Sequence, residues 1–186
     1  MSGRTLFEVS LRYAALGLLA QHPGSGYDLL KRFERSVANV WPATQSQLYG
    51  ELNKLADAGL IEVADIGPRG RKEYRITEAG RAELRRWVAN PPADPPFRSA
   101  ELLRVFLLAE IPRDQAHEHM AAMAERADAE VKRLEELRDS IDWTDSDGLF
   151  YGRAALEYGL RMYAMQADWA RWLVNAIDAR EKVSDI

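Results

Sequence analysis

A polar amphipathic helix followed at once by a short basic hairpin is the feature that most limits the folds open to this chain. Residues 44–60 carry leucines at helical spacing on one face. Segments 60–66 and 72–76 have strand character, and the Gly-Pro-Arg-Gly sequence between them predicts the turn of a hairpin. The fold is therefore limited to architectures in which a two-stranded projection lies beside a helix.

The rest of the amino-terminal half predicts three more helices. Apolar residues at helical spacing indicate helices over 9–21, 25–36 and 79–89. A Pro-Gly step ends the first of them, and Ser25 is a candidate N-cap for the second. The order helix, helix, helix, hairpin, helix predicts a winged helix-turn-helix, a mainly α fold with a small β-hairpin. We expect the last helix to pack through Leu84, Trp87 and Val88.

Several short motifs occur in this region in a fixed order. They are Tyr13-Ala14-Ala15-Leu16-Gly17-Leu18-Leu19, Gly26-Tyr27-Asp28-Leu29, Trp41-Pro42, Gln47-Leu48-Tyr49 with Leu52 and Leu55, Ala58-Gly59-Leu60-Ile61 and Tyr74-Arg75-Ile76-Thr77-Glu78-Ala79-Gly80. Taken together, over roughly residues 11–88, they resemble the PadR family of transcriptional regulators. The resemblance implies a homodimeric, mostly repressing regulator with a helical carboxy-terminal dimerisation domain. It also implies, in many members, an effector such as a phenolic compound or a drug-like aromatic.

A proline-rich junction divides the chain. Four prolines lie within residues 91–96, where they cannot continue a helix and favour an extended, semi-rigid connection. We therefore expect a winged helix-turn-helix DNA-binding domain over 1–90. A helical domain for dimerisation, and for binding an effector if there is one, is expected over 91–186.

The carboxy-terminal half is predicted to form helices over 98–110, 113–141 and 148–182, of which the second and third are long and amphipathic. So much apolar surface on so few helices predicts that a second subunit buries part of it. An intramolecular bundle is the alternative. The two long apolar stripes are Met120, Ala124, Ala127, Val131, Leu134 and Ile141, and Leu156, Leu160, Tyr163, Ala167, Ala170, Val174 and Ile177.

Composition excludes several classes of protein. There is no apolar run near the ~20 residues of a membrane helix, and the absence of cysteine excludes disulfides and thiolate sites. We expect a soluble, cytoplasmic protein.

The net charge of −4 is unevenly divided: residues 1–90 hold 13 Lys/Arg and 10 Asp/Glu, whereas residues 91–186 hold 12 and 19. A mildly basic amino-terminal half is compatible with phosphate binding, although chance asymmetry would give the same pattern.

A helix with an outward polar face, followed by a basic hairpin that forms a wing, is suited to binding duplex DNA. Opposite its leucines the helix shows small, hydrogen-bonding side chains, and Gly50 would let it approach closely. Tyr49 packing at a helix boundary, and a wing whose charges are merely solvated, are the alternatives. The residues predicted to contact DNA are Thr44, Gln45, Ser46, Gln47, Tyr49 and Asn53 at bases or phosphates, Lys54 at a phosphate, and Arg69, Arg71 and Lys72 at the flanking backbone or minor groove.

Aromatic side chains are frequent in the carboxy-terminal half. Flat rings in a cleft at a dimer interface could sandwich a small aromatic effector, whereas ordinary core packing is the alternative for each ring. The sequence identifies neither the ligand nor its site. The rings are those of Trp143, Trp169, Trp172, Tyr151, Tyr158 and Tyr163.

Catalytic and metal-binding patterns find little support. His117 and His119 point about 200° apart around a helix and cannot readily share a metal. Gly24-Ser25-Gly26 lacks the remainder of a nucleotide-binding loop, so it is interpreted as a turn and a cap. Aspartates at 142–147 resemble a calcium loop only superficially, because the first and last ligand positions hold no carboxylate. We predict no enzymatic activity, no cofactor and no metal site.

Two hypotheses of different classes remain. The favoured one is a PadR-like homodimeric repressor that binds an inverted-repeat operator in double-stranded DNA and is released by a small aromatic effector. The alternative is a module that uses a winged helix to hold a protein partner. Salt-dependent binding to a duplex with an inverted repeat separates them, because only DNA binding releases counterions from phosphates.

Overall fold

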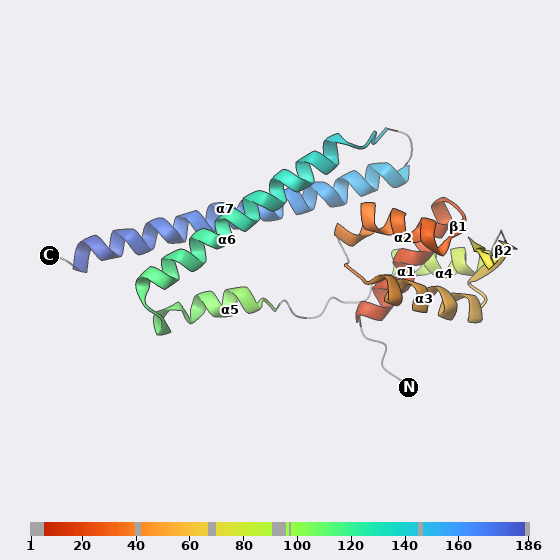
Figure 1. Cartoon of the computed structure of the whole chain (residues 1–186), viewed down its shortest axis with the longest axis horizontal. Helices are drawn as coiled ribbons and strands as arrows, with labels where there is room; N and C mark the ends of the chain where they lie inside the picture. The colour runs from red at the N-terminus through yellow and green to blue at the C-terminus, as the bar shows by residue number, and fades with distance from the viewer. Residues whose placement is uncertain are drawn as a thin grey trace. The chain divides into compact units, whose positions relative to one another are not determined.

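In a computed structural model the chain forms two compact units, Met1–Asp94 and Pro95–Ile186 (Figure 1). The structure describes residues 6–39, 42–66, 70–90, 96, 98–144 and 147–184. Each unit has its own apolar core, and each is described separately below.

The amino-terminal unit is the predicted winged helix-turn-helix. The sequence predicts a turn and a cap at Gly24-Ser25-Gly26, and the structure adds a very short strand there, β1. The first helix begins at Leu6, three residues before the predicted start. The elements in chain order are α1 (Leu6–Gln21), β1 (Gly24–Ser25), α2 (Gly26–Arg35), the 3-10 helix η1 (Val37–Asn39), α3 (Gln45–Asp57), β2 (Ile61–Ile66), β3 (Lys72–Ile76) and α4 (Glu78–Ala89).

Helix starts in this unit follow side-chain caps. Ser25 caps α2, Thr44 caps α3 and Thr77 caps α4, each through a hydroxyl that accepts a hydrogen bond from the backbone N–H three residues on. Such caps satisfy N–H groups that have no partner inside the helix. The prediction that Ser25 caps the second helix is confirmed.

The core of this unit lies among α1, α2, α3 and the sheet. Leu16, Leu19, Leu29, Leu48 and Leu55 are fully buried in it. Burial of one such side chain contributes roughly 1.5–3 kcal/mol, so this cluster accounts for much of the stability of the unit.

Helix α4 packs on α1 through two of the three predicted residues. Leu84 contacts the core cluster, and the Trp87 ring stacks on Tyr13 with ring centroids 4.4 Å apart. The prediction for Val88 is wrong, because its side chain is 65% exposed. Trp87 and Val88 lie on opposite sides of Leu84 around the helix, about 100° apart, and it is the Trp87 side that packs on α1.

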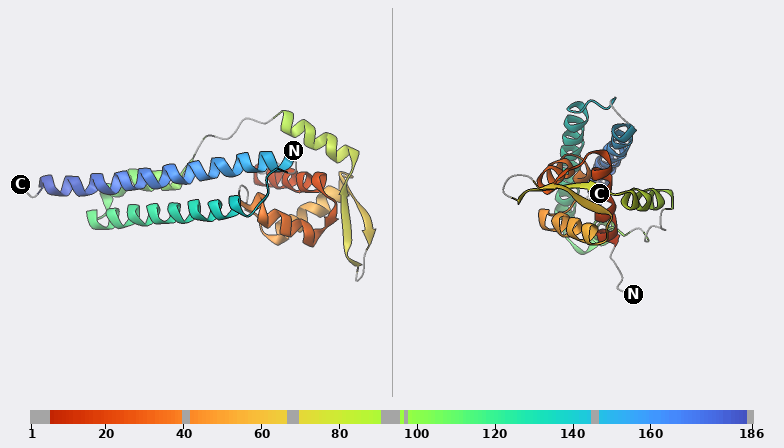
Figure 2. Two further views of the ribbon diagram at one scale, coloured as in Figure 1. Left: turned by 90° about the horizontal axis from the view of Figure 1, so that it is seen from above. Right: turned by 90° about the vertical axis from the view of Figure 1, so that its right-hand side faces the viewer.

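The sheet is small and antiparallel, in the order β1-β3-β2. Strands β2 and β3 form the predicted hairpin and project as a narrow ribbon (Figure 2). The register shifts between Val63 and Asp65, which leaves Ala64 as the extra residue of a β-bulge. Ser25 pairs with Glu73, so β1 ties the start of α2 to the hairpin.

The carboxy-terminal unit contains α5 (Ala100–Phe106), the 3-10 helix η3 (Leu108–Glu110), α6 (Arg113–Asp139) and α7 (Asp147–Ser184). The prediction of a single helix over 98–110 is wrong, because the helix is broken at Leu107. There the backbone N–H groups of Leu107 and Glu110 donate to carbonyls three residues back, which tightens the helix before Pro112. The two long helices end within two residues of the predicted bounds.

Helices α6 and α7 are antiparallel and lie side by side along their length (Figures 1 and 2). Their apolar stripes pack on each other within this chain. One cluster centres on Met120 and Ala170, and a second on Leu134 and Leu160. The intramolecular pairing of these stripes, left as an alternative by the sequence, therefore occurs. Within the described ranges, no helix combines the length and the apolarity needed to cross a membrane.

Candidate nucleic-acid interface

Helix α3 separates its residues into a buried face and an exposed polar face. Leu48, Leu52 and Leu55 are buried in the core of the amino-terminal unit. Ser46 and Asn53, from the opposite face, are exposed. An added Cβ at Gly50 would meet no described atom within 4 Å beyond its own helix backbone, so the helix surface is open there.

The amino-terminal end of α3 is closed by a reciprocal capping box. The Thr44 hydroxyl accepts a hydrogen bond from Gln47 N at 3.3 Å, and Gln47 Oε1 accepts one from Thr44 N at 2.8 Å. Both side chains, which were predicted to contact DNA, are thus held in place by the helix that presents them. Gln45, between them in sequence, is exposed and starts the helix.

Tyr49 packs against the start of α2. A Cβ built on Gly26 would lie 2.6 Å from Tyr49 Cε1, so only glycine leaves room for the ring at this position. The packing that the sequence left as an alternative for Tyr49 is therefore present. It joins the first helix of the helix-turn-helix motif to the second.

A buried acidic residue lies on α3 beside Lys54. Glu51 is 3% exposed, and its carboxylate lies 3.3 Å from Lys54 Nζ and 3.8 Å from Arg12 Nη1 of α1. Arg12 is also buried, at 8% exposure. A buried carboxylate needs a cationic partner to offset the loss of hydration, which explains why Arg12 and Glu51 face each other.

The hairpin carries cations whose surroundings differ. Lys72 is exposed at the start of β3, opposite Ile66 of β2. Arg75 is paired across the hairpin with Glu62, at 2.5 Å between Nε and Oε1. Arg69 lies outside the described residues, so its predicted contact with DNA has no structural description.

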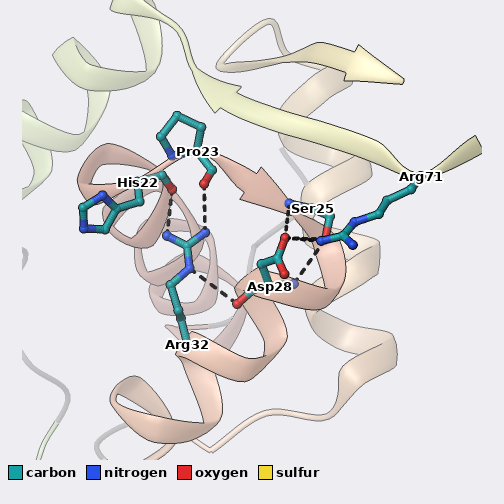
Figure 3. A network of polar contacts seen from close by, with 6 residues as sticks. All are labelled: His22, Pro23, Ser25, Asp28, Arg32 and Arg71. Carbon is teal, nitrogen blue, oxygen red and sulfur yellow. Dashed lines mark hydrogen bonds and ion pairs between the residues drawn. The ribbon is translucent and has the colours of Figure 1, made fainter. Parts of the chain in front are cut away.

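Arg71, immediately before β3, reaches back to α2. Its Nη2 lies 2.6 Å from Asp28 Oδ2 (Figure 3). The same carboxylate oxygen accepts hydrogen bonds from Ser25 N at 3.0 Å and Ser25 Oγ at 2.7 Å. Both partners of the ion pair remain half-exposed, with 52% of the Arg71 side chain and 41% of the Asp28 side chain accessible. Asp28 thus joins the cap of α2 to the turn end of the hairpin.

The electrostatics at Asp28 follow from these contacts. Hydrogen bonds from Ser25 and then from Arg71 stabilise the ionised form and lower the pKa of Asp28 from 3.8 to about 2. The carboxylate is therefore charged throughout the physiological range, and its contact with Arg71 joins two opposite charges.

The sequence predicts no role in this region for three polar residues that the structure brings into ion pairs: Arg12, Asp28 and Glu51. The spacing of Ser25 and Asp28, a cap followed by an acid three residues later, is a local signal that would have found the second. Arg12 and Glu51 are far apart in sequence, and neither carries a local signal for pairing. Only tertiary packing brings them together.

The carboxy-terminal unit has an open hollow of about 670 Å³ where α6 connects to α7. Trp143 lies at its wall, with Nε1 donating to the backbone carbonyl of Arg138 at 2.7 Å. Of the aromatic residues considered for effector binding, Trp169 and Tyr163 are partly buried against the core clusters, whereas Tyr158 and Trp172 are largely exposed. The residues that line the hollow are Trp143, Thr144, Asp147, Phe150, Arg153, Ala154 and Glu157.

Comparison with known families matches each unit separately. Residues 15–86 match the transcriptional regulator PadR-like family, and residues 97–178 match the family described as virulence activator alpha C-term. The first match covers the helix-turn-helix and the hairpin, and the second covers the helices from α5 into α7.

Curated relatives are regulators rather than enzymes. The chain is 37% identical over 86 residues to the probable transcriptional regulator Rv1176c of Mycobacterium tuberculosis, a match that covers 45% of this chain and 46% of that protein. The chain thus spans less than half the length of this relative. It is 30% identical over 129 residues to the negative transcriptional regulator PadR of Bacillus subtilis, which covers 67% of this chain and 71% of that protein.

Solved structures agree with these relatives. Bacillus subtilis PadR in complex with operator DNA has a TM-score of 0.80 and 26% identity, over 90% of this chain and 99% of that one. The same regulator in complex with p-coumaric acid has a TM-score of 0.78 and 26% identity, over 90% and 98%. The fold, the order of its elements and the relatives agree, and the chain belongs to the PadR-like family of transcriptional regulators.

Proposed function

We propose that this protein is a homodimeric repressor that binds an inverted-repeat operator through α3 and the β2–β3 hairpin. The proposal rests on the exposed polar face of α3, which includes Ser46 and Asn53 and is open at Gly50. The buried leucines on the opposite face hold this helix in the core of its unit. The structure of Bacillus subtilis PadR with operator DNA supports it. Residues 1–90 would bind DNA, and residues 91–186 would hold two copies together.

Each DNA contact has a proposed role that follows from chemistry and exposure. Gln45, Ser46 and Asn53 have amide or hydroxyl groups that can donate to or accept from base edges in the major groove. Lys54 lies beside Glu51, and about half of its side chain is exposed. Its ammonium group would supply positive charge to a phosphate. Thr44, Gln47 and Tyr49 would act close to the phosphate backbone at the start of α3, where helix N–H groups also favour anions.

The wing, which is the β2–β3 hairpin with its turn, would supply the remaining positive charge for DNA binding. Arg71 and Lys72 would contact the flanking phosphates or the minor groove, together with Arg69 from the turn. Guanidinium and ammonium groups are favoured there by the negative potential of a narrow groove. These contacts would add affinity for duplexes of any sequence, because phosphates carry no direct sequence information.

A second subunit is supported by the apolar surface of the carboxy-terminal unit. Phe106 is 83% exposed, and Leu103 and Trp172 are each about three-fifths exposed. Large apolar side chains grouped on a few helices favour burial by a partner. The second copy would also place two α3 helices at a fixed separation, which a two-fold symmetric operator requires.

A small aromatic effector is part of the proposal. The hollow at the α6–α7 connection combines the Trp143 and Phe150 rings with the Arg153 cation. Rings can stack on a flat ligand, and a guanidinium can pair with a carboxylate. The complex of Bacillus subtilis PadR with p-coumaric acid supports an acidic aromatic ligand as the first class to test.

The experiment is fluorescence anisotropy with labelled duplexes taken from the region upstream of the coding sequence, at several salt concentrations. We expect higher affinity for duplexes that contain an inverted repeat than for other duplexes, and a steep loss of affinity as the salt concentration rises. Sedimentation should show two chains per duplex. Indifference to every duplex at low ionic strength would refute DNA binding and would favour a protein-interaction module. A cytoplasmic location stays a prediction, which fractionation of cells would check.

A further inference from the structure

The contacts around Asp28 join the start of α2 to Arg71, at the turn end of the hairpin, in a single polar network (Figure 3). Asp28 Oδ2 is held by two hydrogen bonds from Ser25, at 3.0 and 2.7 Å, before any contact with Arg71 is counted. Ser25 is in turn paired with Glu73 in the sheet. The carboxylate is therefore fixed by local structure, and Arg71 joins an acceptor that is already in place.

Arg32 fixes the same region from the other side. Its guanidinium donates to the carbonyl of His22 at 2.7 Å and to those of Leu18 and Pro23 at 3.3 and 3.4 Å. The carbonyls of His22 and Pro23 lie just beyond the end of α1, and that of Leu18 also accepts a hydrogen bond from His22 N at 3.2 Å. A Cβ at Gly24 would lie 2.6 Å from Arg32 Nη2, so a larger residue there would make the guanidinium shift. Arg32 thus contacts the segment around β1 through three backbone carbonyls.

Arg71 keeps capacity for a second anion. A guanidinium has five N–H donors in a planar fork, and the contact with Asp28 is made by Nη2. About half of the Arg71 side chain is exposed. The remaining donors can therefore reach a phosphate while Nη2 stays on the carboxylate, so the carboxylate need not be displaced when DNA binds.

We infer that Asp28 is a positioning residue for DNA binding: its carboxylate holds Arg71, at the turn end of the hairpin, in the orientation in which the arginine meets a phosphate of the duplex. The inference rests on the proposed function, because it assumes that the wing contacts DNA. Holding the guanidinium beforehand reduces the side-chain entropy that is lost on binding. Asp28 itself makes no contact with DNA in this arrangement.

The sign of the effect separates positioning from simple charge. Asp28 is an anion beside a surface that binds a polyanion, so removal of its charge alone should strengthen binding. Loss of positioning should weaken it. The most informative variant is Asp28→Glu, which keeps both the charge and a residue suited to the capping box but moves the carboxylate by one methylene. Asp28→Asn removes the charge and keeps the size.

The test measures operator affinity by anisotropy for the full chain and for Asp28→Glu, Asp28→Asn, Arg71→Gln and the double variant Asp28→Asn/Arg71→Gln. Both single changes at Asp28 are expected to weaken binding by about threefold to tenfold. In the Arg71→Gln background, Asp28→Asn should have no further weakening effect. The matched control is Glu62→Gln, which also removes a carboxylate from an arginine of the hairpin but leaves α2 untouched, and it should not weaken binding.

Several outcomes would overturn the inference. Tighter binding by Asp28→Asn, equal to that of Glu62→Gln, would mean that Asp28 acts only through its charge. Equal weakening with and without Arg71 would mean that the change acts through the fold and not through the arginine. Should Asp28→Asn fail to fold, unaltered affinity of Asp28→Glu would overturn the inference by itself. Absence of binding by the unaltered protein would refute the proposed function and this inference together.

Discussion

The carboxylate of Glu51 on α3 lies 3.8 Å from Nη1 of Arg12 on α1, and both side chains are buried. Arg12 Nη1 has no hydrogen-bond partner among the described residues, so this ion pair is its main compensation. The pair connects the candidate recognition helix to the central helix of its unit. Its energetics therefore bear on how firmly α3 is held.

Removal of one partner of this pair should destabilise the amino-terminal unit. Glu51→Leu is expected to lower the free energy of unfolding by about 3 kcal/mol, because it leaves the Arg12 cation buried without a counter-charge. The double variant Arg12→Met/Glu51→Leu should recover most of the loss, since apolar residues of similar size need no partner. Urea denaturation followed by circular dichroism measures both. A double variant no more stable than Glu51→Leu would contradict this account.

Gly50 gives a prediction with opposite signs for stability and binding. Gly50→Ala should raise the free energy of unfolding by roughly 0.5–1 kcal/mol, because alanine is the better helix former and the added methyl meets open space. If α3 approaches DNA at this position, the same methyl should weaken operator binding. Thermal melts and anisotropy on one protein sample test both parts. Unchanged affinity would show that Gly50 lies away from the duplex.

The wing and the recognition helix should differ in how they affect specificity. Lys72→Gln is expected to weaken binding to all duplexes and to reduce the slope of log affinity against log salt by about 1, because one phosphate contact is lost. Asn53→Ala should act mainly at particular operator positions, at a cost of about 1–3 kcal/mol where a base contact is lost. Competition between operator and random duplexes at several salt concentrations distinguishes the two. If both variants lose affinity equally for operator and random duplexes, Asn53 does not recognise base identity.

The exposed apolar side chains of α5 test the dimer. Phe106→Glu should shift the protein toward monomer, because a carboxylate would be desolvated in the interface without a partner. Ile66→Ser is the control, since Ile66 is also exposed, at 66%, but lies on the hairpin. Sedimentation velocity over a range of concentrations measures the shift. Identical association of both variants with the unaltered protein would exclude Phe106 from the interface.

Acid should weaken the fold partly through Asp28. Its pKa is lowered from 3.8 to about 2 in the folded protein, so folding favours the ionised form. The resulting stability is fully present above about pH 4 and is lost as the pH falls through about 2. Because the pair with Arg71 is half-exposed and screened by salt, the contribution should be no more than about 1 kcal/mol. Acid titration of Asp28→Asn against the unaltered protein should show a shallower decline for the variant between pH 4 and pH 2.

Local signals in the sequence were sufficient for most of the fold. Helical spacing of Leu48, Leu52 and Leu55 predicted the buried face of α3, and these residues are buried. The cap at Ser25 and the two strands of the hairpin were also predicted, because capping and strand alternation depend on residues close in the chain. The strand β1 was missed, since two residues carry no periodicity and its pairing with β3 spans some fifty positions.

Local spacing and ordered motifs were enough to predict the main helices, the hairpin, the family resemblance and the polar face of α3. Packing between distant segments sets how other candidate contacts are held, with Tyr49 over Gly26 and Arg71 on Asp28. Pairs such as Arg12 and Glu51 arise when distant segments are buried together. Burial forces charged groups to find partners, and which partner lies within reach is set by packing rather than by sequence separation.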